Sequence, residues 1–283
     1  MVELDVQLTA DRQLVIVHDD TLDRCSNVHE LFPMRGDRRV QAFTLAEIRT
    51  LDAGSWFARE IDLEPSKRQA FLRSLTPEER HRFITDKDLT HYRDGTVRHP
   101  TLKECLVRAS ELGLGVNIEL KYPTPDKSSQ STQRNNPEAT QLLAESTVRV
   151  IEALGLNRQV LVSSFEHHSL VYVKELRPEI ATGVLVSEPV ADPVTYCKSL
   201  RGAGAYHPGA SGRNDAVGFH SASYMDTGRL PPELFVTLRK ADIDINVWTV
   251  NDPDQMKALI EAGASGIFTD YPNRLVELLS RDR

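Results

Sequence analysis

Short apolar runs rich in β-branched residues alternate with amphipathic stretches along most of the chain. The runs have the length and composition of strands, and the stretches between them are long enough for helical crossovers. Alternation of this kind is typical of a parallel sheet covered by helices. The predicted strands are Val2–Leu8, Val116–Lys121, Val160–Phe165, Thr182–Val186, Ile245–Val250 and Gly266–Thr269, with a weaker one at either Gly204–His207 or Ala216–His220.

Capping residues mark where several predicted helices begin and end. Thr44–Glu47 and Thr101–Glu104 each have the spacing of a capping box, and the second of these helices is expected to end at Gly113. Asp252 precedes a proline, which predicts an N-cap and a first-turn proline for a helix that runs to Gly263. Helices with such clear boundaries fit crossovers between successive parallel strands.

The strand count is one short of a closed (β/α)8 barrel, and a doubly wound open sheet would also fit it. Polar residues favour the barrel, because they lie at the C-terminal ends of the strands, which a barrel gathers around one mouth. We therefore predict an α/β fold, a single (β/α)8 TIM-type barrel domain over residues 1–283 with a missing or incomplete first βα unit. The polar residues are Glu119, Lys121, Ser163, Ser164, Trp248, Asn251 and Asp270.

Two segments interrupt the alternation of strands and helices. Residues from about Asp23 to His99 are too long and too charged for a simple crossover, so we expect an insertion with short helices after the second strand of the barrel. Tyr122–Pro137 is rich in proline and serine and directly follows Glu119 and Lys121. It is expected to be either a mobile lid over the strand ends or a disordered loop.

Composition and charge exclude several classes of function. At 283 residues, with 40% hydrophobic and 27% charged residues, the chain has the composition of an ordinary globular protein. The net charge of -7 without a basic block argues against a nucleic acid partner, and no apolar run is long enough for a transmembrane segment. An anionic substrate remains compatible with this charge, because a bound divalent cation would invert the local potential.

The cysteines and the N-terminus bear on the compartment. Three widely spaced cysteines indicate neither a disulfide framework nor a zinc site, so a reducing, cytoplasmic compartment is the default expectation. The first residues do not form a signal peptide, but a periplasmic or secreted location would follow if a signal preceded Met1. The sequence indicates no oligomeric state. The cysteines are Cys25, Cys105 and Cys197.

Two carboxylates and a histidine lie close together at the start of the chain. Glu3 and Asp5 are two apart in the strand Val2–Leu8, so they point to the same face. A second strand, Leu14–His18, follows a short polar turn, and pairing about that turn would place His18 opposite Asp5. A solvent-facing strand and a strand-ending histidine would explain these residues equally well. The alternative is a hard-cation site beside a proton-transfer group.

Glu119 and Lys121 repeat this alternation on one face of a later strand. On an isolated strand they would form only a neutralising pair. At a barrel mouth with Glu3 and Asp5, they would instead complete a three-carboxylate site for Mg²⁺ or Ca²⁺ with a cation alongside. The lysine would then compensate an additional anionic oxygen on the substrate, which favours a phosphate compound.

Four segments of the sequence together resemble the glycerophosphodiester phosphodiesterase family, in the same order and at suitable spacing. The resemblance covers essentially the whole chain. It implies a TIM-type barrel that hydrolyses small-molecule glycerophosphodiesters to glycerol 3-phosphate and an alcohol. The segments are ELDVQLTADRQLVIVHDDTLDR, NIELK, INVWTVND and GIFTDYP.

The resemblance also implies roles for individual residues. Glu3, Asp5 and Glu119 correspond to the carboxylates that hold a divalent metal, Mg²⁺ or Ca²⁺, in that family. His18 corresponds to a catalytic acid/base.

The remaining implied roles concern the substrate. Lys121 resembles the lysine that contacts the phosphate in the family. Trp248 resembles an aromatic residue that lines the site near the organic part of the substrate, and Phe165 is expected to do the same.

The sequence departs from the family pattern at its start. A His-Arg-Gly motif ends the family's first strand, and neither this motif nor the following Pro-Glu-Asn motif is present here. The hairpin turn has Asp11-Arg12 where the family has Asp-Gly, a tolerable change if the turn does not require glycine. The histidines that could substitute are His167, His168, His207 and His220, and none lies in a matching motif. Surface roles are expected for His167 and His168.

Two explanations of this departure stay open, and they lead to different functions. A shortened form of a longer enzyme, with Met1 an internal methionine, would retain the hydrolase as its function. A chain that lacks the first unit altogether would be a catalytically impaired barrel that binds phosphodiesters or a protein. A phospholipase D-like enzyme acting on lysophospholipids is a third possibility, although the polar loop at 122–137 does not suit a membrane-facing mouth.

Overall fold

The chain forms two compact units in this computed structural model, Met1–Val160 and Leu161–Arg283. The structure describes residues 1–121, 137–187, 190–210 and 230–281. Within these ranges seven strands run parallel to a neighbour in their unit and alternate with helices along the chain. The predicted fold class, an α/β fold with an incomplete (β/α)8 barrel, is confirmed; the extent of a single domain over residues 1–283 stays a prediction.

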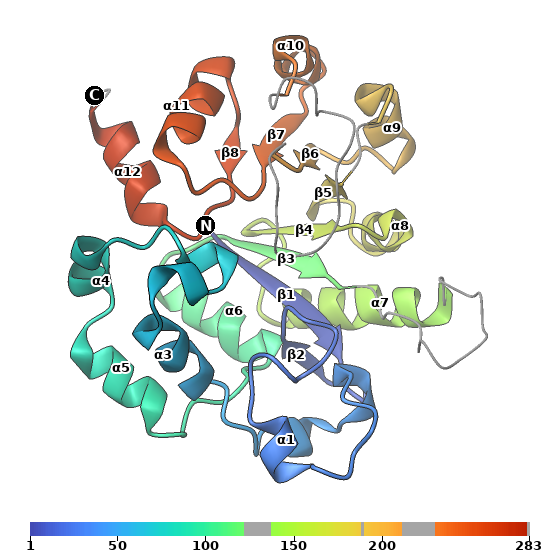
Figure 1. Cartoon of the computed structure of the whole chain (residues 1–283). Coiled ribbons are helices and arrows are strands. Elements are labelled where there is room, and N and C mark those ends of the chain that lie inside the picture. The colour runs from blue at the N-terminus through green and yellow to red at the C-terminus, as the bar shows by residue number, and fades with distance from the viewer. Residues whose placement is uncertain (122–136, 188–189, 211–229, 282–283) are drawn as a thin grey trace. The chain divides into compact units, whose positions relative to one another are not determined.

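In the first unit, β1 (Val2–Leu8) lies between two other strands (Figure 1). It pairs antiparallel with β2 (Leu14–Ile16) and parallel with β3 (Val116–Leu120). The parallel register sets Asp5 level with Glu119. Because residues that are level on neighbouring strands point to the same face, this register brings the acidic positions of β1 and β3 together.

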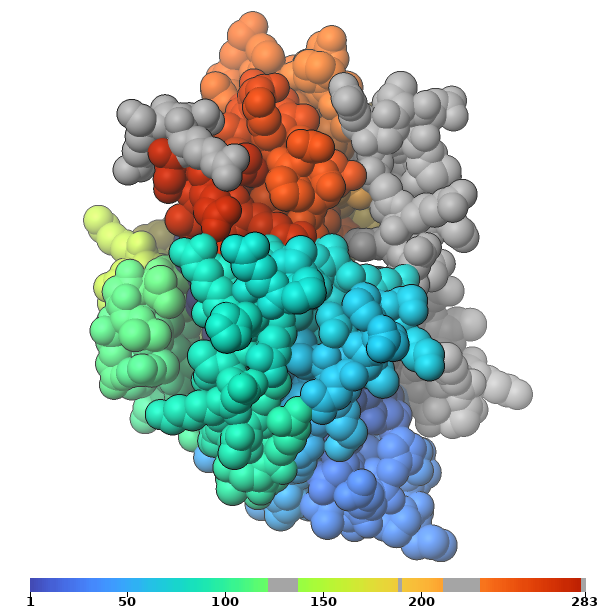
Figure 2. All heavy atoms as spheres, turned by 60° about the vertical axis from the view of Figure 1, so that its left-hand side comes forward, coloured from blue at the N-terminus to red at the C-terminus, as the bar shows by residue number. Residues whose placement is uncertain are grey.

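The predicted insertion forms short helices that pack against the β1–β2 hairpin. Val15 and Val17 of the hairpin share one buried apolar cluster with Phe43 and Ile48 of the insertion. Figure 2 shows the inserted residues, from blue to teal, as one continuous surface on this side of the unit. The helices of this unit are α1 (Val28–Leu31), α2 (Leu45–Ile48), α3 (Ser55–Asp62), α4 (Pro77–Phe83), α5 (Asp86–Arg93), α6 (Leu102–Glu111) and α7 (Pro137–Ala153), with 3-10 turns at Val40–Ala42, Pro65–Lys67 and Ala70–Leu72.

In the second unit five strands pair in chain order, all parallel, and helices separate successive strands. This is the arrangement that right-handed crossover connections produce. The strands are β4 (Val160–Ser164), β5 (Ala181–Val186), β6 (Ala205–Pro208), β7 (Asp244–Val247) and β8 (Gly266–Ile267), and the helices are α8 (His167–Leu176), α9 (Pro193–Ser199), α10 (Pro232–Lys240), α11 (Pro253–Ala262) and α12 (Pro272–Arg281).

The other predicted strands and helix caps are largely confirmed. Strand ends differ by one to three residues, and β6 confirms the Gly204–His207 alternative, whereas Ala216–His220 lies outside the described residues, as do residues 122–136 of the predicted polar loop. Both capping boxes form, at Thr44 and Thr101, and Asp252 caps α11 through the backbone N–H of Gln255. These boundaries depend on residues three apart in the sequence, so they can be predicted without knowledge of tertiary contacts.

The predicted register of the hairpin is wrong by one residue. Val6 pairs with Ile16, and the backbone N–H of Val17 donates to the Asp5 carbonyl at 3.0 Å, so Val17 rather than His18 lies opposite Asp5. The cause is a three-residue loop that ends in a left-handed residue, Arg12, at φ 60°. Arg12 therefore occupies a position that favours glycine, and the chain accepts the change from Asp-Gly by placing an arginine in the left-handed region.

Arg12→Gly should stabilise the fold. An L-residue in the left-handed region costs roughly 1–2 kcal/mol, and glycine removes that strain while losing more backbone entropy on folding. We expect the free energy of unfolding to rise by about 0.5–1 kcal/mol, measured by urea denaturation. Arg12→Val is the matched control and should lower it, because a β-branched residue tolerates positive φ least. Equal stability of the two variants would contradict the assignment.

Candidate active site

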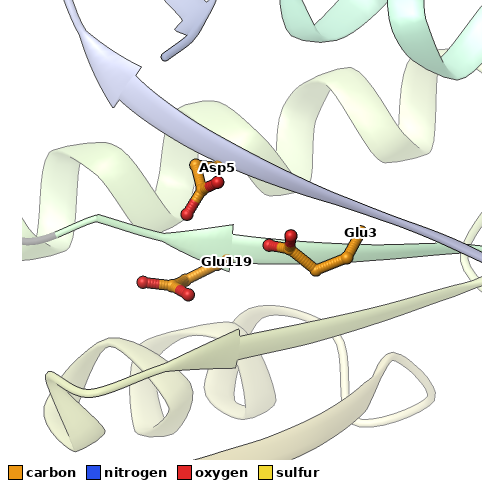
Figure 3. Close-up of side chains that lie close together, drawn as sticks. All are labelled: Glu3, Asp5 and Glu119. Carbon is orange, nitrogen blue, oxygen red and sulfur yellow. The ribbon is translucent and has the colours of Figure 1, made fainter. Parts of the chain in front are cut away.

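Three carboxylates converge on one face of the first unit. Glu3 and Asp5 project from β1 and Glu119 projects from β3, and one oxygen from each lies within 4.8 Å of the others (Figure 3). Alternation along β1 and the level pairing of Asp5 with Glu119 account for this convergence. The structure thus brings together all three predicted metal ligands, whose role as ligands stays a prediction.

Lys121 neutralises part of this charge. Its Nζ lies 3.4 Å from Asp5 Oδ1 and 3.2 Å from Glu119 Oε1, and all three side chains are largely buried. Burial by itself would lower the pKa of Lys121, but the two carboxylates outweigh it and raise that pKa. Burial also raises the pKa of Glu119 despite the attraction of Lys121. One ammonium is thus shared by two buried carboxylates, an arrangement that a further cation would stabilise.

Asn117 adds a further oxygen donor to the same face. It lies two residues before Glu119 on β3, level with Glu3 of β1. The residue is 3% exposed, and within the described residues neither its amide oxygen nor its amide nitrogen has a hydrogen-bond partner. A buried amide without partners is costly, so this face is suited to a bound water or ion. Oxygen donors of this kind fit Mg²⁺ or Ca²⁺, and the donor set therefore suits a hard divalent cation.

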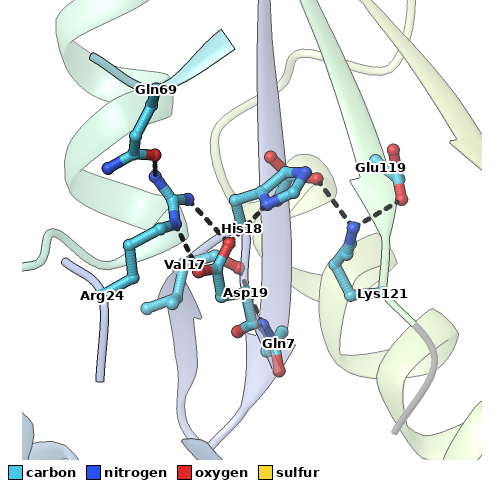
Figure 4. Close-up of polar contacts among 9 residues, drawn as sticks. Gln7, Val17, His18, Asp19, Arg24, Gln69, Glu119 and Lys121 are labelled. Atoms are coloured by element: carbon cyan, nitrogen blue, oxygen red, sulfur yellow. Dashed lines mark hydrogen bonds and ion pairs between the residues drawn. The ribbon is translucent and has the colours of Figure 1, made fainter. Parts of the chain in front are cut away.

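His18 follows the end of β2 and is held through its neighbours. Gln7, which continues the alternation of Glu3 and Asp5 on β1, donates from Nε2 to the carbonyls of Val17 and Asp19 at 2.8 and 2.7 Å. The imidazole Nδ1 of His18 lies 2.7 Å from Asp19 Oδ1. These contacts fix the backbone on both sides of His18 and give its ring one strong partner (Figure 4).

Electrostatics around His18 favour its charged form. The hydrogen bond to Asp19 raises the pKa of His18 most, burial opposes this, and the charge of Asp5 raises it further while that of Lys121 lowers it. The interactions with Asp5 and Lys121 place the imidazole within electrostatic reach of the carboxylate cluster. An imidazolium near a site for an anionic substrate is suited to donating a proton.

Phe165 and Trp248 pack against each other in the second unit. Their ring centroids lie 5.4 Å apart at an interplanar angle of 90°, an edge-to-face contact. The indole Nε1 of Trp248 donates to the carbonyl of His207 at 2.8 Å, and Phe165 is exposed. The structure therefore brings these two predicted residues together as one aromatic pair, and their contact with substrate stays a prediction.

Two of the other histidines are held inside the second unit by burial or hydrogen bonds. His207 is buried, and burial lowers its pKa to about 3. A surface role was expected for His167, but this residue is half-buried. Its two ring nitrogens lie 2.6 Å from the hydroxyl of Tyr196 and 2.8 Å from the carbonyl of Leu185. His168 is exposed, as expected, and His220 lies outside the described residues.

Comparison with known proteins identifies the family. Residues 1–274 match the model of the Glycerophosphoryl diester phosphodiesterase family. The chain belongs to this family. Its members include a glycerophosphodiester phosphodiesterase of Caldanaerobacter subterraneus subsp. tengcongensis, which is 27% identical over 99% of this chain and 86% of its own length. Another, from Bacillus altitudinis, is 28% identical over 98% of this chain and 85% of its own length.

Solved structures agree on the fold. A phosphodiesterase of Oleispira antarctica, in complex with the product sn-glycerol-3-phosphate, has a TM-score of 0.68 and 24% identity, and the match covers 99% of this chain and 84% of that one. A glycerophosphoryl diester phosphodiesterase structure from Silicibacter pomeroyi also has a TM-score of 0.68, at 20% identity over 99% and 83% of the two chains. Among the described residues, no helix combines the length and the apolar character needed to cross a membrane.

Four residues that complete the site are not among those predicted from the sequence. Gln7 and Asn117 lie on the same strand faces as the predicted ligands, so the alternation that revealed Glu3, Asp5 and Glu119 also contains a signal for them. The other two are Asp19 and Arg24. Asp19 contacts both His18 and Arg24, but these contacts depend on the loop after β2, which has no periodic pattern from which to predict them.

The imidazole of His18 should titrate above the ordinary histidine pKa of about 6.5. Its protonated form stabilises the fold below that pH, and this contribution is lost as pH rises through the raised folded pKa. Side-chain NMR titration measures it, with His99 as internal reference, since burial lowers the pKa of His99 to about 4. A His18 value below about 6.5 would contradict the role of Asp19.

Proposed function

We propose that this protein is a metal-dependent glycerophosphodiester phosphodiesterase. It would hydrolyse deacylated phospholipid head groups, such as glycerophosphocholine or glycerophosphoethanolamine, to glycerol 3-phosphate and an alcohol. The observation that carries the proposal is the convergence of Glu3, Asp5 and Glu119 beside Lys121 in a chain of this family. A product complex of a related fold, with sn-glycerol-3-phosphate, supports the substrate class.

The carboxylate cluster is assigned to a divalent cation. Glu3, Asp5 and Glu119 would hold Mg²⁺ or Ca²⁺ through oxygen, and Asn117 lies on the same face with an unused amide oxygen. When bound, the cation supplies Lewis acidity toward a phosphoryl oxygen of the substrate. The two largely buried carboxylates, Asp5 and Glu119, share the single ammonium of Lys121, and this supports the assignment.

Lys121 and His18 are assigned to the phosphate and the leaving group. Lys121 places positive charge where a phosphodiester concentrates negative charge during attack on phosphorus. A hydroxyl or water oxygen forms the new bond to phosphorus and gives up its proton to solvent. The bond from phosphorus to the departing alcohol oxygen breaks, and that oxygen takes a proton from His18. The raised pKa of His18 keeps its imidazole protonated over more of the neutral range, as this role requires.

The aromatic pair is assigned to the organic part of the substrate. Phe165 and Trp248 form an edge-to-face pair in the second unit, in which Phe165 is exposed, and an aromatic ring can pack against a choline-type cation or a glycerol backbone.

A barrel that binds phosphodiesters without hydrolysing them is the second candidate. It is favoured because burial lowers the pKa of His99, His167 and His207, whereas His18 has a raised pKa and interacts with the carboxylate cluster. Such a protein would bind the cation and the phosphodiester but release no product. Activity measured on the chain as given separates the two.

Glu119→Gln should weaken metal binding. Loss of an outer-shell partner typically costs 10- to 100-fold in metal affinity, so loss of a direct carboxylate ligand should cost at least about 100-fold. Isothermal titration with Mg²⁺ and with Ca²⁺ measures it. Glu111→Gln is the matched control, since Glu111 pairs with Arg108 on the surface of α6. Unchanged affinity in Glu119→Gln would remove the cluster from metal binding.

His18→Asn should abolish most hydrolysis. Release of glycerol 3-phosphate from glycerophosphocholine, with Mg²⁺ or Ca²⁺ and with EDTA, is the measurement. General acid catalysis contributes about 10²- to 10⁴-fold, so kcat should fall by that factor in the variant. His91→Asn is the control, since His91 pairs with Asp94 at the end of α5. Metal binding without release in the wild type would favour the binding protein instead.

A further inference from the structure

Arg24 connects the histidine segment to the insertion. Its Nε and Nη2 donate to the two carboxylate oxygens of Asp19 at 2.6 and 2.7 Å, a bidentate pair. Its Nη1 donates to Gln69 Oε1 at 2.8 Å, and the guanidinium lies 5.3 Å from the ring centroid of Trp56. Figure 4 shows the bonds that lead from Gln69 through Arg24 and Asp19 to His18. Because Nε and Nη2 of Arg24 each bond a different oxygen of Asp19, the carboxylate is fixed in one orientation.

The two anchors of Arg24 are themselves held within the insertion. The backbone N–H of Gln69 donates to Glu60 Oε2 at 2.9 Å, and the indole of Trp56 donates to the carbonyl of Ala53 at 3.0 Å. The Trp56 ring also makes edge-to-face contacts with Phe57 and Phe71. The Trp56 ring therefore cannot turn without breaking other contacts, and the backbone of Gln69 is fixed at the point where its side chain meets the guanidinium.

Asp19 determines which nitrogen of His18 carries a proton. Hydrogen bonds from Arg24 and His18 hold the pKa of Asp19 well below its usual range, although burial raises it. An ionised carboxylate only accepts hydrogen bonds, so Nδ1 of His18, at 2.7 Å, must be the donor. The other ring nitrogen, Nε2, then gains and loses the exchangeable proton.

We infer that Asp19 and Arg24 are positioning residues that hold the His18 imidazole with a proton on Nδ1 and leave Nε2 to exchange protons, and that the insertion anchors them through Gln69 and Trp56. The expected effect on kcat rests on the proposed function, whereas the assignment of the tautomer does not. Residues 55–72 of the insertion thereby become part of the active site's support without touching the substrate.

The proton balance fits this arrangement. In the imidazolium form both ring nitrogens of His18 carry protons, and Nε2 gives its proton to the departing alcohol oxygen as the phosphorus–oxygen bond breaks. The neutral imidazole left behind keeps its proton on Nδ1, bonded to Asp19, and so needs no rearrangement. Nε2 then takes a proton from solvent before the next turnover.

The spectroscopic test reads the tautomer directly and does not depend on activity. Ring ¹⁵N shifts of His18, recorded above its pKa, should show a proton on Nδ1 in the wild-type protein. In Asp19→Ala the proton should move mainly to Nε2, the form that a free imidazole side chain prefers. Retention of the Nδ1 proton in Asp19→Ala would overturn the inference.

The kinetic test uses two arginines in similar settings. Arg24→Lys keeps the charge but loses the bidentate pair and the ring contact, and kcat should fall about 10- to 100-fold with little change in KM. Arg35→Lys is the control, because Arg35 also pairs with a carboxylate, Glu47, and lies over an aromatic ring, Phe43. The two arginine side chains are also similarly exposed, at 34% and 33%.

The outcomes separate the inference from the proposed function. An equal loss in Arg24→Lys and Arg35→Lys would overturn the inference, because it would reflect general destabilisation. Gln69→Leu leaves Asp19 and Arg24 in place, and a smaller fall in kcat than in Arg24→Lys supports the anchor. If the wild-type protein releases no glycerol 3-phosphate, the proposed function fails, and the tautomer of His18 in the wild type and Asp19→Ala still decides the inference.

Discussion

Repulsion among three carboxylates is the constraint around which the first unit is organised. The parallel register of β1 and β3 brings Glu3, Asp5 and Glu119 within 4.8 Å, and burial makes the charges of Asp5 and Glu119 more costly. Lys121 relieves part of this cost because it directly follows β3 on the same face. The cation proposed for this cluster would relieve more of it, so that binding and folding would favour the same arrangement.

Period-two alternation made much of this arrangement predictable. The bounds of β1 were predicted to the residue, and the shared face of its acidic positions followed from strand geometry alone. The hairpin register was not predictable in the same way, because it depends on Arg12 adopting positive φ, which its side chain disfavours. A glycine at that position would have indicated the loop type, and with it the register.

Contacts between distant segments could not be predicted from the sequence. Arg24 and Gln69 are 45 residues apart, and nothing periodic in the insertion indicates which side chain will face Arg24. The insertion was recognised from its length and charge, but these properties say only that it does not form a simple crossover. Its relation to the site depends on how α3 and the turn at Ala70–Leu72 pack, which is a tertiary property.

The exposure of His18 explains why such a support is needed. Its side chain is 61% exposed, so packing alone does not restrict the ring, and an unrestrained imidazole would sample several rotamers and both tautomers. A charge-assisted hydrogen bond to Asp19 restricts both at once, provided that the carboxylate is itself fixed. Arg24 fixes the carboxylate by a bidentate pair. Contacts with Trp56 and Gln69 in turn restrict the conformations of the Arg24 side chain. An accessible proton donor can therefore be oriented without being buried, and the insertion provides the contacts that make this possible.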